Sequence, residues 1–141
     1  MIIKRFWKTL LWASLILLIC AMPSSEVDKL PLIPIPHFDK IVHFVLYFVL
    51  SATMIWEYSK NKELKTSNKL IYIWVGLLAF TYGVGVEILQ GTVLTSRSAS
   101  WSDILANGAG TAIAIISYPQ LKSLAKRFRD KFLFMKVSKN I

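Results

Sequence analysis

The chain of 141 residues contains four long apolar stretches, and these constrain its fold more than any other feature. They cover roughly residues 6–22, 41–58, 70–89 and 104–118. A helix needs about 20 residues to cross the ~30 Å hydrocarbon core of a bilayer, where only helices and closed barrels satisfy their backbone hydrogen bonds. We therefore predict an all-α fold, a four-helix transmembrane bundle. Its fourth helix must extend through Asp103 or past Pro119 to span the bilayer.

Composition favours a membrane domain over a soluble one. Hydrophobic residues make up 55% of the chain and charged residues 18%, whereas a soluble domain carries about 25% charged residues. The first apolar stretch follows a basic segment, as in a secretory signal peptide, but the sequence CAMPSS lacks a typical cleavage site. We expect the stretch to be retained, with cleavage as the alternative. The single cysteine, Cys20, cannot form an internal disulfide.

The basic residues are distributed unevenly among the segments that connect the apolar stretches. Fourteen of the 17 lie before the first stretch, between the second and third, or after the fourth. Only Lys29, Lys40 and Arg97 lie elsewhere. Basic residues near helix ends are retained in the cytoplasm. We therefore predict a multi-pass protein of the cell (inner, cytoplasmic) membrane with both termini cytoplasmic.

The last segment, residues 121–141, differs in character from the rest of the chain. Its apolar residues recur every three or four positions and alternate with lysines and arginines. This pattern predicts a C-terminal amphipathic basic helix that lies on the anionic cytoplasmic leaflet. We accordingly divide the chain into a transmembrane domain, residues 1–120, and a cytoplasmic tail, residues 121–141. The net charge of +9 does not indicate nucleic-acid binding, because no docking motif accompanies it.

Polar side chains gather at the predicted extracytoplasmic ends of three helices. The second helix begins with Asp39, Lys40 and His43, the third ends with Glu87 and Gln90, and the fourth begins with Asp103 and Asn107; Arg97 lies in the loop between the last two. Helical spacing places Glu87 and Gln90 on the same face as Gly76, Ala79 and Gly83. Small residues allow helices to pack closely in lipid. We therefore expect these polar side chains to converge inside the bundle.

Ionisable residues within a membrane are costly and usually functional. We interpret Glu87, His43 and Asp103 as candidate catalytic groups, with Glu87 or His43 as the general base. Asp39, Lys40, Gln90, Arg97 and Asn107 are candidate ligand-binding groups, and the guanidinium of Arg97 suits a phosphate or carboxylate.

Each of these residues has an alternative interpretation. Glu87 could form a structural ion pair, Asp39 and Asp103 could stabilise helix starts, and Asn107 could bond to another helix. A metal site that combines His43 with His37 and the acids is a further alternative. We expect neither a cofactor nor a metal.

The segments DKIVH (from Asp39), EILQ (from Glu87) and SDILANGAG (from Ser102), together with Arg97, resemble the VanZ-like family over about residues 39–114. The family usually has a second glycine where this chain has Ala114. The resemblance implies a multi-pass envelope protein, in a family whose founding member is associated with reduced sensitivity to the glycopeptide teicoplanin.

The favoured functional hypothesis is a site that binds or modifies a lipid headgroup or a lipid-linked envelope precursor. The partners would be membrane lipids or that precursor, with no nucleic acid, and a homo-oligomer is possible. One alternative is a small proton- or ion-coupled transporter in which Glu87 and His43 titrate. Another is a non-catalytic structural or partner-binding membrane subunit whose polar residues only hold the helices together.

Overall fold

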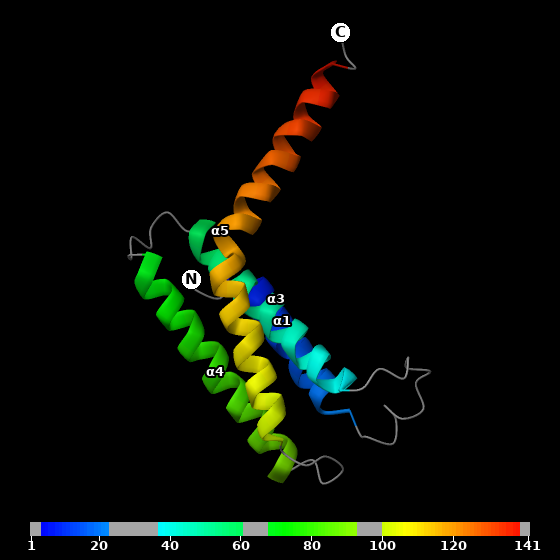
Figure 1. Ribbon diagram of the computed structural model, residues 1–141, viewed down its shortest axis with the longest axis vertical. Helices are drawn as coiled ribbons and strands as arrows, with labels where there is room; N and C mark the ends of the chain where they lie inside the picture. Colours follow the sequence, from blue (N-terminus) through cyan, green and yellow to red (C-terminus); the bar gives the residue numbers. More distant parts are fainter. Residues whose placement is uncertain (1–3, 23–36, 61–67, 93–99, 139–141) are drawn as a thin grey trace.

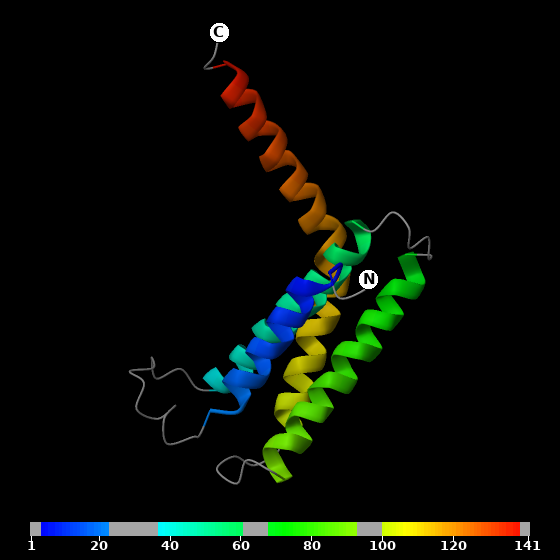
Figure 2. The same ribbon diagram turned by 180° about the vertical axis from the view of Figure 1, so that it is seen from behind.

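The computed structural model describes residues 4–22, 37–60, 68–92 and 100–138, and all its regular structure there is helical. The helices are α1 (Trp7–Cys20), α3 (Phe38–Lys60), α4 (Asn68–Thr92) and α5 (Trp101–Ser138), and they run up and down beside one another (Figures 1 and 2). No strand occurs within these residues. The prediction of an all-α fold is therefore confirmed for the described part of the chain.

Two helices are long and apolar enough to cross a membrane. They cover Phe38–Lys60 and Lys69–Thr92, and only 33% and 28% of their most apolar windows are buried within the protein. Ile73, Trp74, Leu77 and Leu78 of α4 are each more than half exposed. Because a water-soluble protein rarely exposes so large an apolar surface, these helices indicate a membrane protein. A full set of four spans stays a prediction, since α1 has 14 residues and a length of about 21 Å.

Helix α5 extends past Pro119, which is one of the two extensions that the sequence allowed for the fourth helix. The expected boundary between a bundle helix and a separate tail helix falls at residue 120, but α5 continues without interruption through 38 residues with Pro119 inside it. A proline removes one intrahelical hydrogen bond and favours a bend. The helix changes direction in this region, and its C-terminal part projects away from the other helices (Figures 1 and 2). That this part lies on a cytoplasmic membrane surface stays a prediction.

Helices α3 and α5 pack more extensively than any other pair. Their contact depends on Gly110, because a Cβ at this position would overlap the backbone carbonyl of Phe44. One turn along α5 from Asn107, the Thr111 hydroxyl accepts a hydrogen bond of 3.2 Å from the Ser51 hydroxyl. Such small residues allow helix backbones to approach closely. The α3–α5 contact therefore fixes the positions of residues near the start of both helices.

Helix α4 presents its small residues to the bundle, as predicted. Ala79 is buried, and Gly83 lies against the Tyr47 ring and the Asn107 amide. Glu87 and Gln90 continue the same face and are also buried. The expected inward orientation of this face is thus confirmed.

Helix α1 is attached to α3 and α4 by hydrogen bonds that involve backbone groups. The Trp12 indole N–H donates to the Leu46 carbonyl over 2.9 Å. The Tyr82 hydroxyl donates to the Ala13 carbonyl over 2.6 Å. At the start of α1, the carboxylate of Glu57 accepts hydrogen bonds from the backbone N–H groups of Lys8 and Thr9. Glu57 therefore caps a helix that lies almost fifty residues away in sequence.

A groove of about 980 Å³ lies between the end of α3 and the C-terminal part of α5. Its walls include the apolar side chains of Phe48, Val49 and Trp56. The charged side chains that line it among the described residues are all basic: Lys8, Lys60, Lys122, Lys126 and Arg129. The ammonium groups of Lys8 and Lys60 lie 4.4 and 3.7 Å from the centre of the Trp56 ring. This groove lies at the opposite end of the bundle from Glu87 and Asp103.

Candidate functional site

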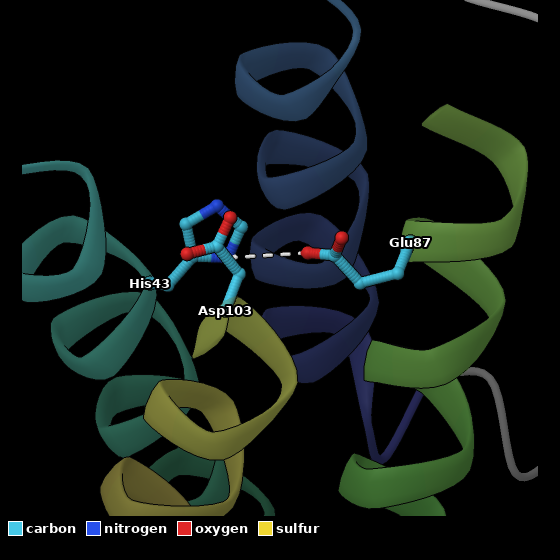
Figure 3. A group of neighbouring side chains, drawn as sticks. All are labelled: His43, Glu87 and Asp103. Carbon is cyan, nitrogen blue, oxygen red and sulfur yellow. Dashed lines mark ion pairs between the residues drawn. The ribbon is translucent and has the colours of Figure 1, made fainter. Parts of the chain in front are cut away.

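The predicted site residues of three helices converge at one end of the bundle. His43 lies in the second turn of α3, Glu87 near the end of α4, and Asp103 in the first turn of α5. Because α4 runs antiparallel to α3 and α5, these positions lie at the same end (Figure 1). Figure 3 shows the three side chains pointing toward one another. The predicted convergence is confirmed.

His43 lies at the centre of this cluster. Its Nδ1 atom is 3.1 Å from the Asn107 amide oxygen and 3.9 Å from Glu87 Oε1. Since an amide oxygen only accepts hydrogen bonds, the contact with Asn107 places a proton on Nδ1. The imidazole is thereby held between α4 and α5, with an oriented proton near a carboxylate.

The two carboxylate oxygens of Glu87 have different surroundings. Oε2 accepts a hydrogen bond of 3.0 Å from the backbone N–H of Ser100, just before α5. Oε1 has no hydrogen-bond partner among the residues that the structure describes. Glu87 is only 2% exposed, so water from outside does not readily supply the missing bond. A buried, unsatisfied carboxylate oxygen is costly, which makes this atom the strongest candidate for contact with a ligand.

Lys40 joins the two aspartates of the cluster. Its ammonium lies 2.8 Å from Asp39 Oδ2 and 3.2 Å from Asp103 Oδ1. Asp103 is the more buried partner and Asp39 the more exposed one. With Glu87 included, the described part of the site contains three carboxylates and one lysine. A ligand that places positive charge against the carboxylates is therefore electrostatically favoured.

Two further polar atoms near the cluster lack partners within the described segments. The Tyr47 hydroxyl and the Asn107 amide nitrogen are both buried and unpaired. Tyr47 was not among the site residues predicted from the sequence, although it lies one turn after His43 on the same face of α3. Its position against Gly83 places it beside Asn107. The unpaired atoms of Tyr47, Glu87 and Asn107 come from three different helices.

Gln90 contacts α1 within the protein. Its side-chain N–H donates to the Cys20 carbonyl over 2.9 Å, which satisfies a carbonyl at the end of that helix. This bond gives Gln90 a structural function, and its predicted contact with a ligand stays a prediction.

Two candidates from the sequence remain, Arg97 and His37. Arg97 is outside the described residues. His37 precedes α3 in a left-handed conformation with φ 59°, and its carbonyl accepts bonds from the N–H groups of Lys40 and Ile41. His37 therefore helps to start α3, and it is not part of the group of possible metal ligands. That group consists of His43, Glu87 and Asp103, whose donor atoms lie within 4.8 Å of one another.

Comparison with known proteins adds a family match to this geometry. The family model described as VanZ/LLP1 matches residues 2–124. A protein of Schizosaccharomyces pombe, described as uncharacterized protein C11E3.10, is 29% identical over 101 residues, which cover 72% of this chain and 59% of the relative. The chain thus matches somewhat more than half the length of that relative. No solved structure matches the chain significantly.

Proposed function

The chain belongs to the VanZ/LLP1 family, and we propose that it binds or modifies a lipid headgroup or a lipid-linked precursor of the cell envelope. The site is the cluster of His43, Glu87 and Asp103 with Lys40 and Asn107 beside it. In this proposal the protein crosses the membrane several times and has both termini in the cytoplasm. The cluster then faces the extracytoplasmic side.

The charge distribution supports this orientation. Lys8 and Lys60 lie at the end of the bundle where α1 begins and α3 ends, and Lys122, Lys126 and Arg129 extend along α5 beyond it. Basic groups near helix ends favour the cytoplasmic side. The basic groove formed by these residues would face the anionic inner leaflet, where each lysine or arginine contributes about 1 kcal/mol of attraction.

The unsatisfied oxygen of Glu87 is the observation that carries the proposal. A carboxylate that only joins helices would be expected to use both oxygens in hydrogen bonds, as buried polar groups normally do. Glu87 uses Oε2 in this way, whereas Oε1 faces His43 and has no hydrogen-bond partner in the part of the chain that the structure describes. The carboxylate and the imidazole are thus placed to exchange a proton with a ligand or to bind its cationic part.

Lys40 and Asp39 provide a second point of contact. The Asp39 side chain is the most exposed member of the site, so an anionic headgroup can replace it at the Lys40 ammonium while Asp103 stays in place. Arg97, which lies between α4 and α5 in the sequence, would supply a second cation in the proposal. A headgroup with both a phosphate and an amine would match the mixed charges of the site.

Binding of a soluble lipid analogue tests the proposal directly. Purified protein in detergent is titrated calorimetrically with dihexanoyl phosphatidylethanolamine and dihexanoyl phosphatidylglycerol. We expect Glu87→Gln and Asp103→Asn to weaken binding at least about tenfold, which corresponds to about 1.4 kcal/mol. Glu57→Gln, a change of the buried carboxylate at the other end, serves as the matched control. Equal affinities for the wild type and the site variants would contradict the proposal.

A link to glycopeptide resistance is the cellular form of the same proposal. If the site acts on an envelope precursor or lipid, expression of the chain should change the sensitivity of cells to teicoplanin, and Glu87→Gln should abolish the change. If the wild type and Glu87→Gln changed teicoplanin sensitivity equally, the change would not depend on this site.

A structural function is the second candidate, and Gln90 favours it. The bond from Gln90 to the Cys20 carbonyl shows that part of the polar face of α4 holds the helices together. If all the polar residues served this purpose, each substitution would lower the melting temperature. Functional residues, in contrast, often leave stability unchanged or increase it when they are replaced.

A further inference from the structure

The donor atoms of the cluster have the chemistry and spacing of a metal site. One imidazole nitrogen and one oxygen from each of two carboxylates lie within 4.8 Å of one another, and they come from α3, α4 and α5 (Figure 3). We propose that His43, Glu87 and Asp103 bind a divalent first-row metal ion, such as Zn²⁺ or Mn²⁺, with the Asn107 amide oxygen as a fourth ligand. The proposal deepens the proposed function and rests on the same site.

The distances leave room for one ion between the ligands. Metal–nitrogen and metal–oxygen bonds of about 2.0–2.2 Å place the ligand atoms of a tetrahedral ion about 3.3–3.6 Å apart. The Nδ1 atom of His43 is 3.9 Å from Glu87 Oε1 and 3.1 Å from Asn107 Oδ1. Shifts of less than about 1 Å in these side chains would complete the coordination, which rotation about their terminal bonds can supply.

Neighbouring groups orient both carboxylates for this purpose. The backbone N–H of Ser100 binds Glu87 Oε2, and the Lys40 ammonium binds Asp103 Oδ1. Each acid is thus fixed through one oxygen, as the ligands of metal sites commonly are. At Glu87 the other oxygen, Oε1, is buried and has no hydrogen-bond partner in the described segments. This unpaired oxygen supports a metal site independently of the clustering of the three side chains. A bound ion would supply the interaction that the oxygen lacks.

Charge balance also favours a divalent ion. Glu87 and Asp103 together contribute two negative charges, which neutralise the ion in a place where an unpaired charge would be costly. Coordination through Nδ1 requires a neutral imidazole whose proton is on Nε2. In the metal-bound form, the proton that Nδ1 now directs at Asn107 would therefore lie on Nε2.

A bound ion would define how the site recognises its ligand. Three or four protein ligands leave at least one coordination position for a five- or six-coordinate ion, and a phosphate oxygen of a headgroup is a suitable occupant. This explains how a site with three carboxylates and one lysine can accept an anionic group. The ion supplies the positive charge that the described side chains lack.

The experiment uses the full chain, purified in detergent and stripped of metal with EDTA. The protein is incubated with MnCl₂ or ZnCl₂ and desalted, and its metal content and melting temperature are measured. Mn²⁺ is also followed by electron paramagnetic resonance. We expect about one ion per chain and a higher melting temperature with metal. In Glu87→Gln, His43→Gln and Asp103→Asn, we expect affinity to fall by at least about tenfold.

Controls separate a loss of ligands from a loss of structure. Glu57→Gln should bind metal like the wild type, because Glu57 lies at the other end of the bundle. Each site variant should retain its helical circular dichroism without metal. The absence of bound ion in the wild type, or an unchanged affinity in Glu87→Gln and Asp103→Asn, would overturn the proposal.

Lipid titrations with and without EDTA distinguish this inference from the proposed function. Headgroup binding that depends on Glu87 but not on metal would contradict the metal site and leave the function intact. Metal binding without headgroup binding would support the metal site and contradict the proposed function.

Discussion

Two buried glutamates, Glu57 and Glu87, lie at opposite ends of the helix bundle, and they are 4% and 2% exposed. Both oxygens of Glu57 accept hydrogen bonds from the first turn of α1: from the Lys8 N–H, the Thr9 N–H and the Thr9 hydroxyl, over 2.8–3.1 Å. Within the described segments Glu87 has one such bond, from the Ser100 N–H. Its other oxygen faces an imidazole 3.9 Å away.

The difference separates a structural carboxylate from a candidate functional one. Glu57 caps a helix, and a carboxylate at a helix N-terminus is stabilised both by free N–H groups and by the helix dipole. Both of its oxygens are used in hydrogen bonds within the protein. Glu87 is equally buried but retains an unused acceptor, so its desolvation is not fully compensated. Burial alone therefore does not distinguish the two glutamates, whereas the unpaired oxygen of Glu87 within the described residues does.

The largest expected effect concerns Gly110, because the α3–α5 contact holds the Glu87 cluster but not the Glu57 cap. The Cβ of Gly110→Ala would overlap the Phe44 carbonyl, and the helices must separate. We expect the free energy of unfolding to fall by about 3 kcal/mol, together with a loss of ligand binding at the Glu87 cluster. Gly108→Ala is the control, since its Cβ meets no atom within 4 Å. Thermal unfolding in detergent measures both, and equal melting temperatures would show that the helices do not pack as closely as described.

Substitution of Glu57 should have the next largest effect. In Glu57→Ala the N–H groups of Lys8 and Thr9 lose their acceptor in a partly buried position, and α1 loses its cap. We expect stability to decrease by about 2 kcal/mol, with unchanged ligand affinity in the molecules that remain folded. Glu57→Gln should be milder because its amide oxygen still accepts. If Glu57→Ala were as stable as the wild type, Glu57 would not have the structural function described above.

The sequence allowed the polar cluster around Glu87 to be predicted, but not the capping of α1 by Glu57. Helical periodicity placed His43, Glu87 and Asp103 on inward faces. Because each lies near the end of its helix, and the three ends were predicted on the same side of the membrane, the side chains were expected to meet. Glu57 offered no such signal. Its partners are backbone N–H groups, which are present at every helix start, so nothing in the side-chain pattern shows which start it caps.

The continuity of α5 was one of the two extensions that the sequence left open for the fourth helix. Proline in a helix interior normally indicates a boundary, and the change from apolar to basic residues near Pro119 supported one. The helix nevertheless continues through Pro119 and changes direction in this region (Figures 1 and 2). Local sequence thus suggested a break that the helix accommodates as a bend.

A smaller effect is expected at Gln90, which lies one turn beyond Glu87 and shares its face but resembles Glu57 in its bonding. Gln90→Ala removes the hydrogen bond to the Cys20 carbonyl. We expect a loss of about 1 kcal/mol in the free energy of unfolding and little change in metal or headgroup affinity. Gln120→Ala, at an exposed position of α5, is the control. A large loss of ligand affinity without a loss of stability would instead place Gln90 in the binding site, as the sequence first suggested.

The smallest effect on stability is expected at Glu87 itself. In Glu87→Gln the amide oxygen can accept the Ser100 N–H bond, while the amide nitrogen faces His43 in place of the unsatisfied Oε1. The variant removes a buried charge without breaking a hydrogen bond, so the metal-free protein should be as stable as the wild type or slightly more stable. Its loss should appear only in metal and headgroup binding. If Glu87→Gln instead lowers the melting temperature of the metal-free protein as much as Glu57→Ala does, the two glutamates have the same structural function. The carboxylate of Glu87 would then stabilise the fold through its charge, without any contribution from a ligand.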